Sequence, residues 1–101
     1  MEYNVRGDDN SKELFLQGRL TFSDNVVFRK IVDDLKEYNG TKCVFDLSSL
    51  EFIDSAGLGM LMLLRDATVG KPFALSIRNA DGQVRRMLEI AKFDALIPFE
   101  D

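Results

Sequence analysis

The side chains of this chain that could take part in chemistry gather in residues 46–59, which read Asp-Leu-Ser-Ser-Leu-Glu-Phe-Ile-Asp-Ser-Ala-Gly-Leu-Gly. This segment offers hydroxyls and carboxylates. The 101 residues contain no histidine and a single cysteine, Cys43. This composition excludes Ser-His and Cys-His pairs, histidine metal sites, an internal disulfide and a CxxC site. The sequence therefore predicts a protein that is not an enzyme, with no catalytic residue, no metal site and no cofactor.

Ser55 is the hydroxyl in this segment whose position has two interpretations. We expect it to be the N-cap of a helix over residues 55–68 that ends at Gly70. Serine is a preferred N-cap because its hydroxyl satisfies a free backbone N–H of the first turn. A phosphate added to the same oxygen would meet the positive end of the helix. Spacing alone leaves both roles open.

Gly57 and Gly59 lie in the first turn of that predicted helix. Each is disfavoured there relative to alanine by roughly 1 kcal/mol. They indicate either close packing of the helix on a sheet or close approach of a partner to this backbone.

The same helix is apolar nearly all round. At 100° per residue, the face toward a sheet would hold Ala56, Met60, Leu63, Leu64 and Ala67. The opposite face would hold Leu58, Leu61 and Met62, beside Arg65. A second apolar face on so small a chain favours a partner surface, with cover by the hairpin or the chain end as the alternative.

Three strands would position this segment. Residues 2–6 and 13–20 alternate polar and apolar side chains around turn residues 7–11, which predicts an antiparallel hairpin. Residues 43–47 are continuously apolar apart from Asp46, as in a strand covered on both faces. Cys43 in such a strand is expected to be a small buried hydrophobe rather than a reactive thiol.

The other predicted elements follow from apolar spacing and caps. A first helix would begin at Ser23 with Asp24 in its first turn and end in a left-handed Asn39-Gly40 closure, with a core stripe of Phe28, Ile31, Val32 and Leu35. After a strand at 73–77, a third helix would be capped by Asp81 or Asn79, with a core stripe of Val84, Met87, Leu88 and Ala91. Residues 96–99 would be extended.

This order predicts an α/β fold: one domain over residues 1–101, with three helices and a mixed sheet of about four to five strands. With 13 basic and 17 acidic side chains, a net charge of −4 argues against nucleic acid as a partner. The polar start resembles no signal peptide, and the longest apolar run, Met60 to Leu64, is too short to insert directly into a membrane. We therefore expect a cytoplasmic protein.

The segment from Phe52 to Gly59 resembles the signature loop of STAS domains of the anti-sigma factor antagonist type. The preceding Cys43–Ser48, the upstream Gly18-Arg19-Leu20 and the late Phe93–Pro98 are also similar to that family and stand in the same order. The likeness covers nearly the whole chain. Relative to the family, the chain would lack the usual final helix, which favours self-association, and a homodimer is left open.

The resemblance implies a bacterial phosphorylation switch in transcription regulation. Ser55 would be phosphorylated by a serine kinase with an ATPase-type fold that is also an anti-sigma factor. The unmodified chain would bind that kinase, and a phosphatase of the PP2C type would restore Ser55. The implied partner-binding residues are Asp54, Ser55, Ala56, Gly57, Leu58, Gly59, Leu61, Met62 and Asp24. Asp24 is included because Thr21 stands where many members have an aspartate.

Two alternatives remain. A receiver-like domain would hold Mg²⁺ with Asp8, Asp9 and Asp46 and accept a phosphoryl group on Asp46. The other alternative keeps the STAS fold: the chain would be the STAS subunit of a membrane lipid ABC transporter and would bind its ATPase without a phosphorylation switch.

Overall fold

The computed structural model describes residues 1–100, which form four strands and three α-helices. In chain order these are β1 (Glu2–Gly7), β2 (Ser11–Leu20), α1 (Asn25–Lys36), β3 (Lys42–Ile53), α2 (Ser55–Thr68), β4 (Ala74–Arg78) and α3 (Gly82–Ile90). The sheet order is β1-β2-β3-β4, with β1 antiparallel to β2 and the other pairs parallel. The predicted α/β class, the hairpin and the mixed sheet are confirmed.

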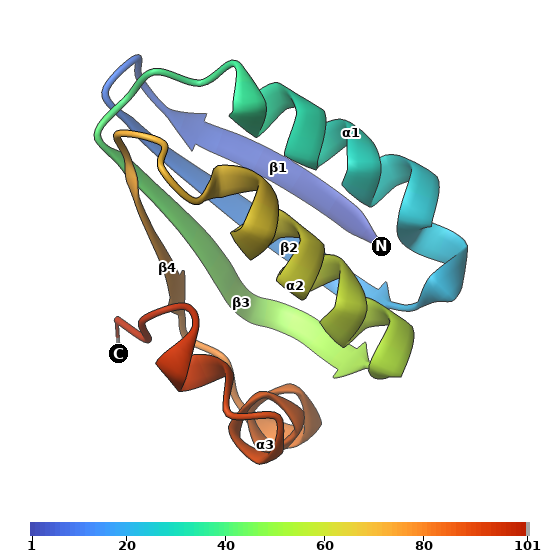
Figure 1. Ribbon diagram of the computed structural model, residues 1–101. Coiled ribbons are helices and arrows are strands. Elements are labelled where there is room, and N and C mark those ends of the chain that lie inside the picture. The colour runs from blue at the N-terminus through green and yellow to red at the C-terminus, as the bar shows by residue number, and fades with distance from the viewer. Residues whose placement is uncertain (101) are drawn as a thin grey trace.

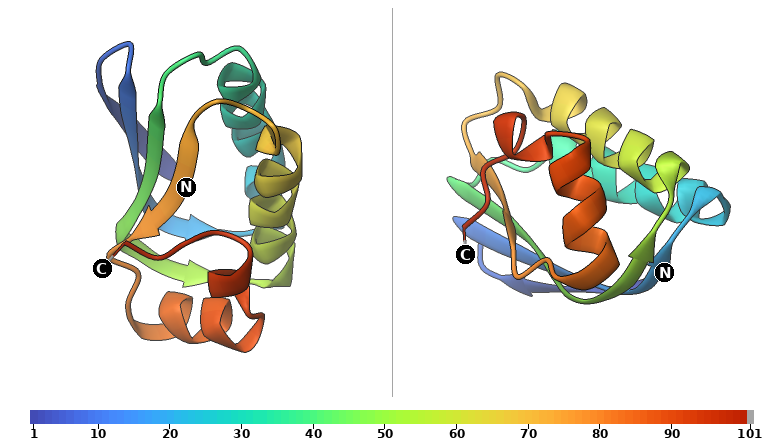
Figure 2. Two further views of the ribbon diagram at one scale, coloured as in Figure 1. Left: turned by 60° about the vertical axis from the view of Figure 1, so that its left-hand side comes forward. Right: turned by 90° about the horizontal axis from the view of Figure 1, so that it is seen from below.

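Helices α1 and α2 lie side by side on one face of the sheet, and α3 lies next to the far end of β3 (Figure 1). Figure 2 shows the same two layers from the side, with both long helices on one side of the sheet. The core between the layers is built from aliphatic and aromatic side chains that are almost fully buried, among them Leu16, Leu20, Phe28, Phe45 and Leu64. Cys43 of β3 lies in this core, and burial raises the pKa of its thiol to about 12.

Strand β3 is longer than predicted and runs on through residues 48–53. Its first half is paired on both sides, but β4 ends opposite Asp46, and only β2 continues alongside. Leu20 lies opposite Ile53, so the C-terminal ends of β2 and β3 lie side by side. This shared end brings the residues that follow β2 next to the start of α2.

The first helix differs from its prediction at both ends. Thr21, rather than Ser23, precedes a 3₁₀ turn over Phe22–Asp24 that leads into α1. The helix ends at Lys36 with Glu37 as its C-cap, and Gly40 does not adopt the predicted left-handed conformation. The ring of Tyr38 lies against Gly40 instead. The Tyr38 hydroxyl donates to the carbonyl of Lys42 at 2.7 Å, which folds the ring back over this turn.

Helix α2 is rotated about its axis relative to the predicted orientation. Its buried positions are Gly57, Met60, Leu61, Leu64 and Thr68. Leu61 was expected on the exposed face and is fully buried, whereas Leu63 was expected in the core and is 45% exposed. This rotation of roughly 80° follows from Gly57, which has no side chain and faces β2. In α3, Asp81 is the N-cap, and Ala91 is exposed rather than part of the core stripe.

We expect Leu61→Ala to lower the free energy of unfolding by about 2–5 kcal/mol, because it opens a cavity in a packed core. Met62→Ala, at the neighbouring exposed position, should change it by less than about 1 kcal/mol. Denaturant unfolding of the two variants measures this difference. Equal losses would contradict this rotation of α2.

Candidate functional site at the start of helix α2

Asp54, not Ser55, caps α2. The Asp54 backbone is extended, and its carboxylate accepts a hydrogen bond from the backbone N–H of Gly57 at 2.7 Å. Ser55 is the first helical residue, and its side chain is exposed. Within residues 1–100, its hydroxyl makes no hydrogen bond. The expected capping role of Ser55 is therefore wrong, and the hydroxyl is left accessible at the positive end of the helix.

Gly57 explains how the helix can begin so close to the sheet. A Cβ at Gly57 would lie 2.5 Å from the Leu20 carbonyl oxygen and 2.7 Å from a side-chain carbon of Ile53. The close approach that the sequence left open is thus internal, to β2 and β3. At Gly59 a Cβ would meet nothing within 4 Å, and this residue is exposed.

Four apolar side chains are exposed on α2 and on the turn and helix that follow β2. Two of them, Met62 (36% exposed) and Leu63 (45%), belong to α2. The others, Phe22 (70%) and Val26 (77%), come from the turn before α1 and from α1 itself. We call these four residues the apolar patch. Phe22, Val26 and Leu63 were not predicted from the sequence to be site residues. The available signal was that Phe22 and Val26 are apolar but fall outside the core stripe of Phe28, Ile31, Val32 and Leu35.

A groove between α1 and α2 runs beside the patch. Its volume is 390 Å³, and it is lined by Phe22, Asn25, Phe28, Arg29, Ala56, Gly59, Met60 and Leu63. Of the site residues predicted from the sequence, Ala56 and Gly59 therefore face α1, and Met62 is exposed on the outer side of α2. Leu58 is only half-buried and packs against the core.

Asp24 is occupied by contacts within the chain and is nearly buried. Its carboxylate accepts hydrogen bonds from the amino group of Met1 (2.8 Å) and from the backbone N–H of Thr21 (2.9 Å). Burial acts to raise the pKa of Asp24, but these two donors outweigh it, so the pKa lies below its ordinary value. The carboxylate of Asp24 holds the turn before α1 in place, and contact of Asp24 with a partner stays a prediction.

The receiver-like alternative is wrong because its three carboxylates are not brought together. Asp8 accepts hydrogen bonds from the backbone N–H groups of Asn10 and Ser11 in the hairpin turn. Asp46 lies opposite Phe15, about 13 Å further along β2 from Ser11, and binds the side chains of Arg78 and Asn79. No group of three or more potential metal ligands occurs in residues 1–100.

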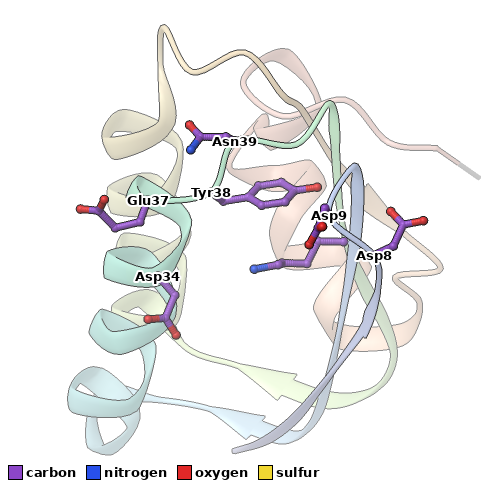
Figure 3. A pocket seen from close by; sticks show the side chains of 7 residues that line it. Asp8, Asp9, Asp34, Glu37, Tyr38 and Asn39 are labelled. Carbon is purple, nitrogen blue, oxygen red and sulfur yellow. The ribbon is translucent and has the colours of Figure 1, made fainter.

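Asp8 and Asp9 instead line an acidic pocket of 390 Å³ with Lys12 and the end of α1, as Figure 3 shows. The ammonium of Lys12 lies 4.6 Å from the centre of the Tyr38 ring. The ten residues of β2, about 33 Å in length, separate this pocket from the start of α2. The acidic pocket is thus independent of Ser55.

No helix of the described residues is long and apolar enough to cross a bilayer.

Comparisons with known proteins agree with this architecture. The family model described as "Mlab, STAS domain" matches residues 3–98. A STAS-domain containing protein of Pseudomonas aeruginosa, PA14_20770, is 33% identical over 89 residues, which cover 88% of this chain and 87% of that protein. An anti-sigma factor antagonist from Mycobacterium paratuberculosis superposes with a TM-score of 0.85 at 19% identity, over 97% of this chain and 83% of that one.

The anti-sigma factor antagonist SpoIIAA in its unphosphorylated form has a TM-score of 0.75 at 16% identity, over 99% of this chain and 89% of that one. The phosphorylated form of SpoIIAA, described as a Bacillus cell fate determinant, has a TM-score of 0.66 at 15% identity, over 99% and 92%. The fold of this chain is therefore that of the anti-sigma factor antagonists. The chain belongs to the STAS domain family.

The two glycines of α2 give a direct test of the close approach. Gly57→Ala should lower the free energy of unfolding by about 1–3 kcal/mol, because the added methyl group overlaps the Leu20 carbonyl. Gly59→Ala should leave it unchanged or raise it by up to about 1 kcal/mol through helix propensity. Thermal or urea unfolding distinguishes the two. A neutral Gly57→Ala would contradict the contact between α2 and β2.

Proposed function

We propose that this chain is an anti-sigma factor antagonist that binds a serine kinase or anti-sigma factor through the start of α2 and is switched by phosphorylation of Ser55. The partner surface comprises Asp54, Ser55, Ala56, Gly59 and Met62, with Leu58 at its margin. It also includes the remaining patch residues, Phe22, Val26 and Leu63. A PP2C-type phosphatase would remove the phosphate, and the chain itself would carry out no reaction.

The observation that carries this proposal is the exposed Ser55 hydroxyl at a helix N-terminus beside exposed apolar side chains. A kinase can reach this hydroxyl because it is neither buried nor used as the cap. A protein partner that covers the apolar patch would remove Phe22 and Val26 from water, which is favourable by about 25 cal/mol per Å² of apolar area. Such a partner would also cover Ser55. The neighbours solved as anti-sigma factor antagonists, one of them in a phosphorylated form, support this role.

The effect of a phosphate at Ser55 follows from what surrounds it. A phosphoserine carries about −1.5 to −2 charges at neutral pH, and the carboxylate of Asp54 is the preceding side chain. In the free chain, water and the positive end of α2 stabilise the phosphate. Under an apolar partner the same charge would lose its hydration beside a second negative charge, at a cost of several kcal/mol. Phosphorylation should therefore release the partner without unfolding the chain.

Substitutions at Ser55 should separate partner binding from stability. Ser55→Ala should keep the partner bound and change the free energy of unfolding by no more than about 0.5 kcal/mol, since this exposed side chain is not the cap. Ser55→Glu should weaken binding by at least about tenfold yet stabilise the free chain by roughly 0.3–1 kcal/mol at the helix N-terminus. Calorimetry against the purified kinase and thermal melts measure both quantities.

Ser49→Glu provides the matched control, because Ser49 is an exposed serine on β3 that does not line the groove. It should bind as the wild type does. Equal affinities for Ser55→Ala and Ser55→Glu would exclude the phosphorylation switch.

The apolar patch can be tested in the same assay. Phe22→Glu and Met62→Glu should each weaken partner binding by about tenfold or more, because a carboxylate would be desolvated in the interface. Their unfolding midpoints should remain close to the wild type because both side chains are exposed. Ile90→Glu is the control, since Ile90 is an equally exposed apolar residue on α3, outside the patch. Loss of binding in Ile90→Glu alone would place the interface elsewhere.

A second candidate function is supported by the description of the matching family model, "Mlab, STAS domain". In this case the chain would be the STAS subunit of a membrane lipid ABC transporter, and the same patch would bind the ATPase. Mass spectrometry of proteins retained by the immobilised chain discriminates the two. A kinase-type ATPase that is retained by Ser55→Ala and lost with Ser55→Glu supports partner switching. An ABC ATPase that binds both variants equally supports the transporter subunit.

A further inference from the structure

Gln83, in the first turn of α3, binds the backbone of the last residue of β3. Its side-chain oxygen accepts a hydrogen bond from the Ile53 N–H at 3.0 Å, and its side-chain nitrogen donates to the Ile53 carbonyl at 2.8 Å. Only one orientation of the amide satisfies both groups, since the reverse would place donor against donor and acceptor against acceptor. The side chain thus replaces one residue of a neighbouring strand.

This contact fills a gap in the sheet. β4 pairs with β3 only from Lys42 to Asp46, so no strand of the described chain pairs with that edge of β3 at Ile53. An unpaired N–H and C=O in this half-buried place would be unfavourable by about 1–3 kcal/mol each. Gln83 removes that penalty immediately before the segment that holds Asp54 and Ser55.

The backbone is held on the opposite side as well. The N–H of Asp54, the next residue, donates to the carbonyl of Leu20 on β2 at 3.3 Å. The peptide group between Ile53 and Asp54 is therefore hydrogen-bonded on both sides: its carbonyl to Gln83 of α3 and its N–H to Leu20 of β2. α3 itself is anchored by Val84 and Leu88, which are fully buried. Gln83 therefore connects the Ser55 segment to a helix that is fixed in the core.

We propose that Gln83 is a positioning residue that holds the Asp54–Ser55 segment in its binding geometry and couples α3 to the state of Ser55. This inference rests on the proposed function for the role of Ser55, but the coupling itself is a property of the free chain. Gln83 touches neither the partner nor the phosphate. It acts through the backbone of Ile53, so a change at Ser55 reaches the first turn of α3.

The first test is amide hydrogen exchange on the free chain. In Gln83→Met, which keeps the side-chain length without the amide, the N–H groups of Ile53, Asp54 and Gly57 should exchange about tenfold faster or more. The N–H of Leu16 in the middle of β2 should be unchanged. Arg86→Ala, an exposed change on the same helix, is the control and should leave all of them unchanged. Faster exchange at Ile53 alone would overturn the proposal, because it would show a lost hydrogen bond with no effect on the site.

The second test measures the coupling. Ser55→Glu should shift the amide resonances of Gly82 to Arg85 when Gln83 is present, and the shifts should disappear in the double variant with Gln83→Met. Shifts that persist in the double variant would overturn the proposal. If Gln83→Met does not fold, Gln83→Glu gives the same test, since it keeps the acceptor for the Ile53 N–H and replaces the donor with an oxygen that faces the Ile53 carbonyl, acceptor against acceptor. Neither readout requires a kinase, so a failed phosphorylation switch and a failed coupling are distinguishable.

Discussion

The parallel pairing of β2 with β3 is the constraint on which the rest of the site depends. It places Leu20 opposite Ile53, so that the C-terminal ends of the two strands lie side by side. The Leu20 carbonyl then receives the N–H of Asp54 and lies against Gly57, which sets both the start of α2 and its rotation. The exposure of Leu63 follows from that rotation, and the turn after β2 brings Phe22 to the same groove.

The cap and the candidate acceptor are two different residues. Asp54 satisfies the free N–H of Gly57, and its carboxylate does so whatever happens at the next side chain. If Ser55 were the cap, a modification of its hydroxyl would replace the bond that starts the helix. Because the bond belongs to Asp54, Ser55 can change its charge while the helix start is preserved. This separation allows a change in surface charge without a change in fold.

The sequence predicts the order of strands and helices well because the spacing of apolar residues reflects local physics, whereas the predicted caps at Ser23 and Ser55 are wrong. The hairpin, the order of strands and helices and the buried stripe of α1 all follow from apolar spacing, and the family resemblance adds the candidate acceptor. Which face of α2 packs on the sheet could not be predicted from apolar spacing. A helix that is apolar nearly all round shows no single apolar face in its sequence. A tertiary contact at Gly57 decides it. Gln83 was missed for a similar reason: its partner lies thirty residues away, on an edge that becomes unpaired only because β4 is short.

Because Cys43 is buried, the reactivity of its thiol can be used to measure unfolding of the chain. Burial raises the pKa of this thiol to about 12, so very little of it is in the reactive thiolate form at neutral pH. The surrounding core also excludes reagents of ordinary size, because Cys43 is fully buried. A thiol-specific label should therefore react only with molecules in which the central strand has opened. The rate of labelling of the native chain, with no engineered cysteine, reports the frequency of that opening, and oxidants that act on exposed thiols leave the folded molecule unchanged.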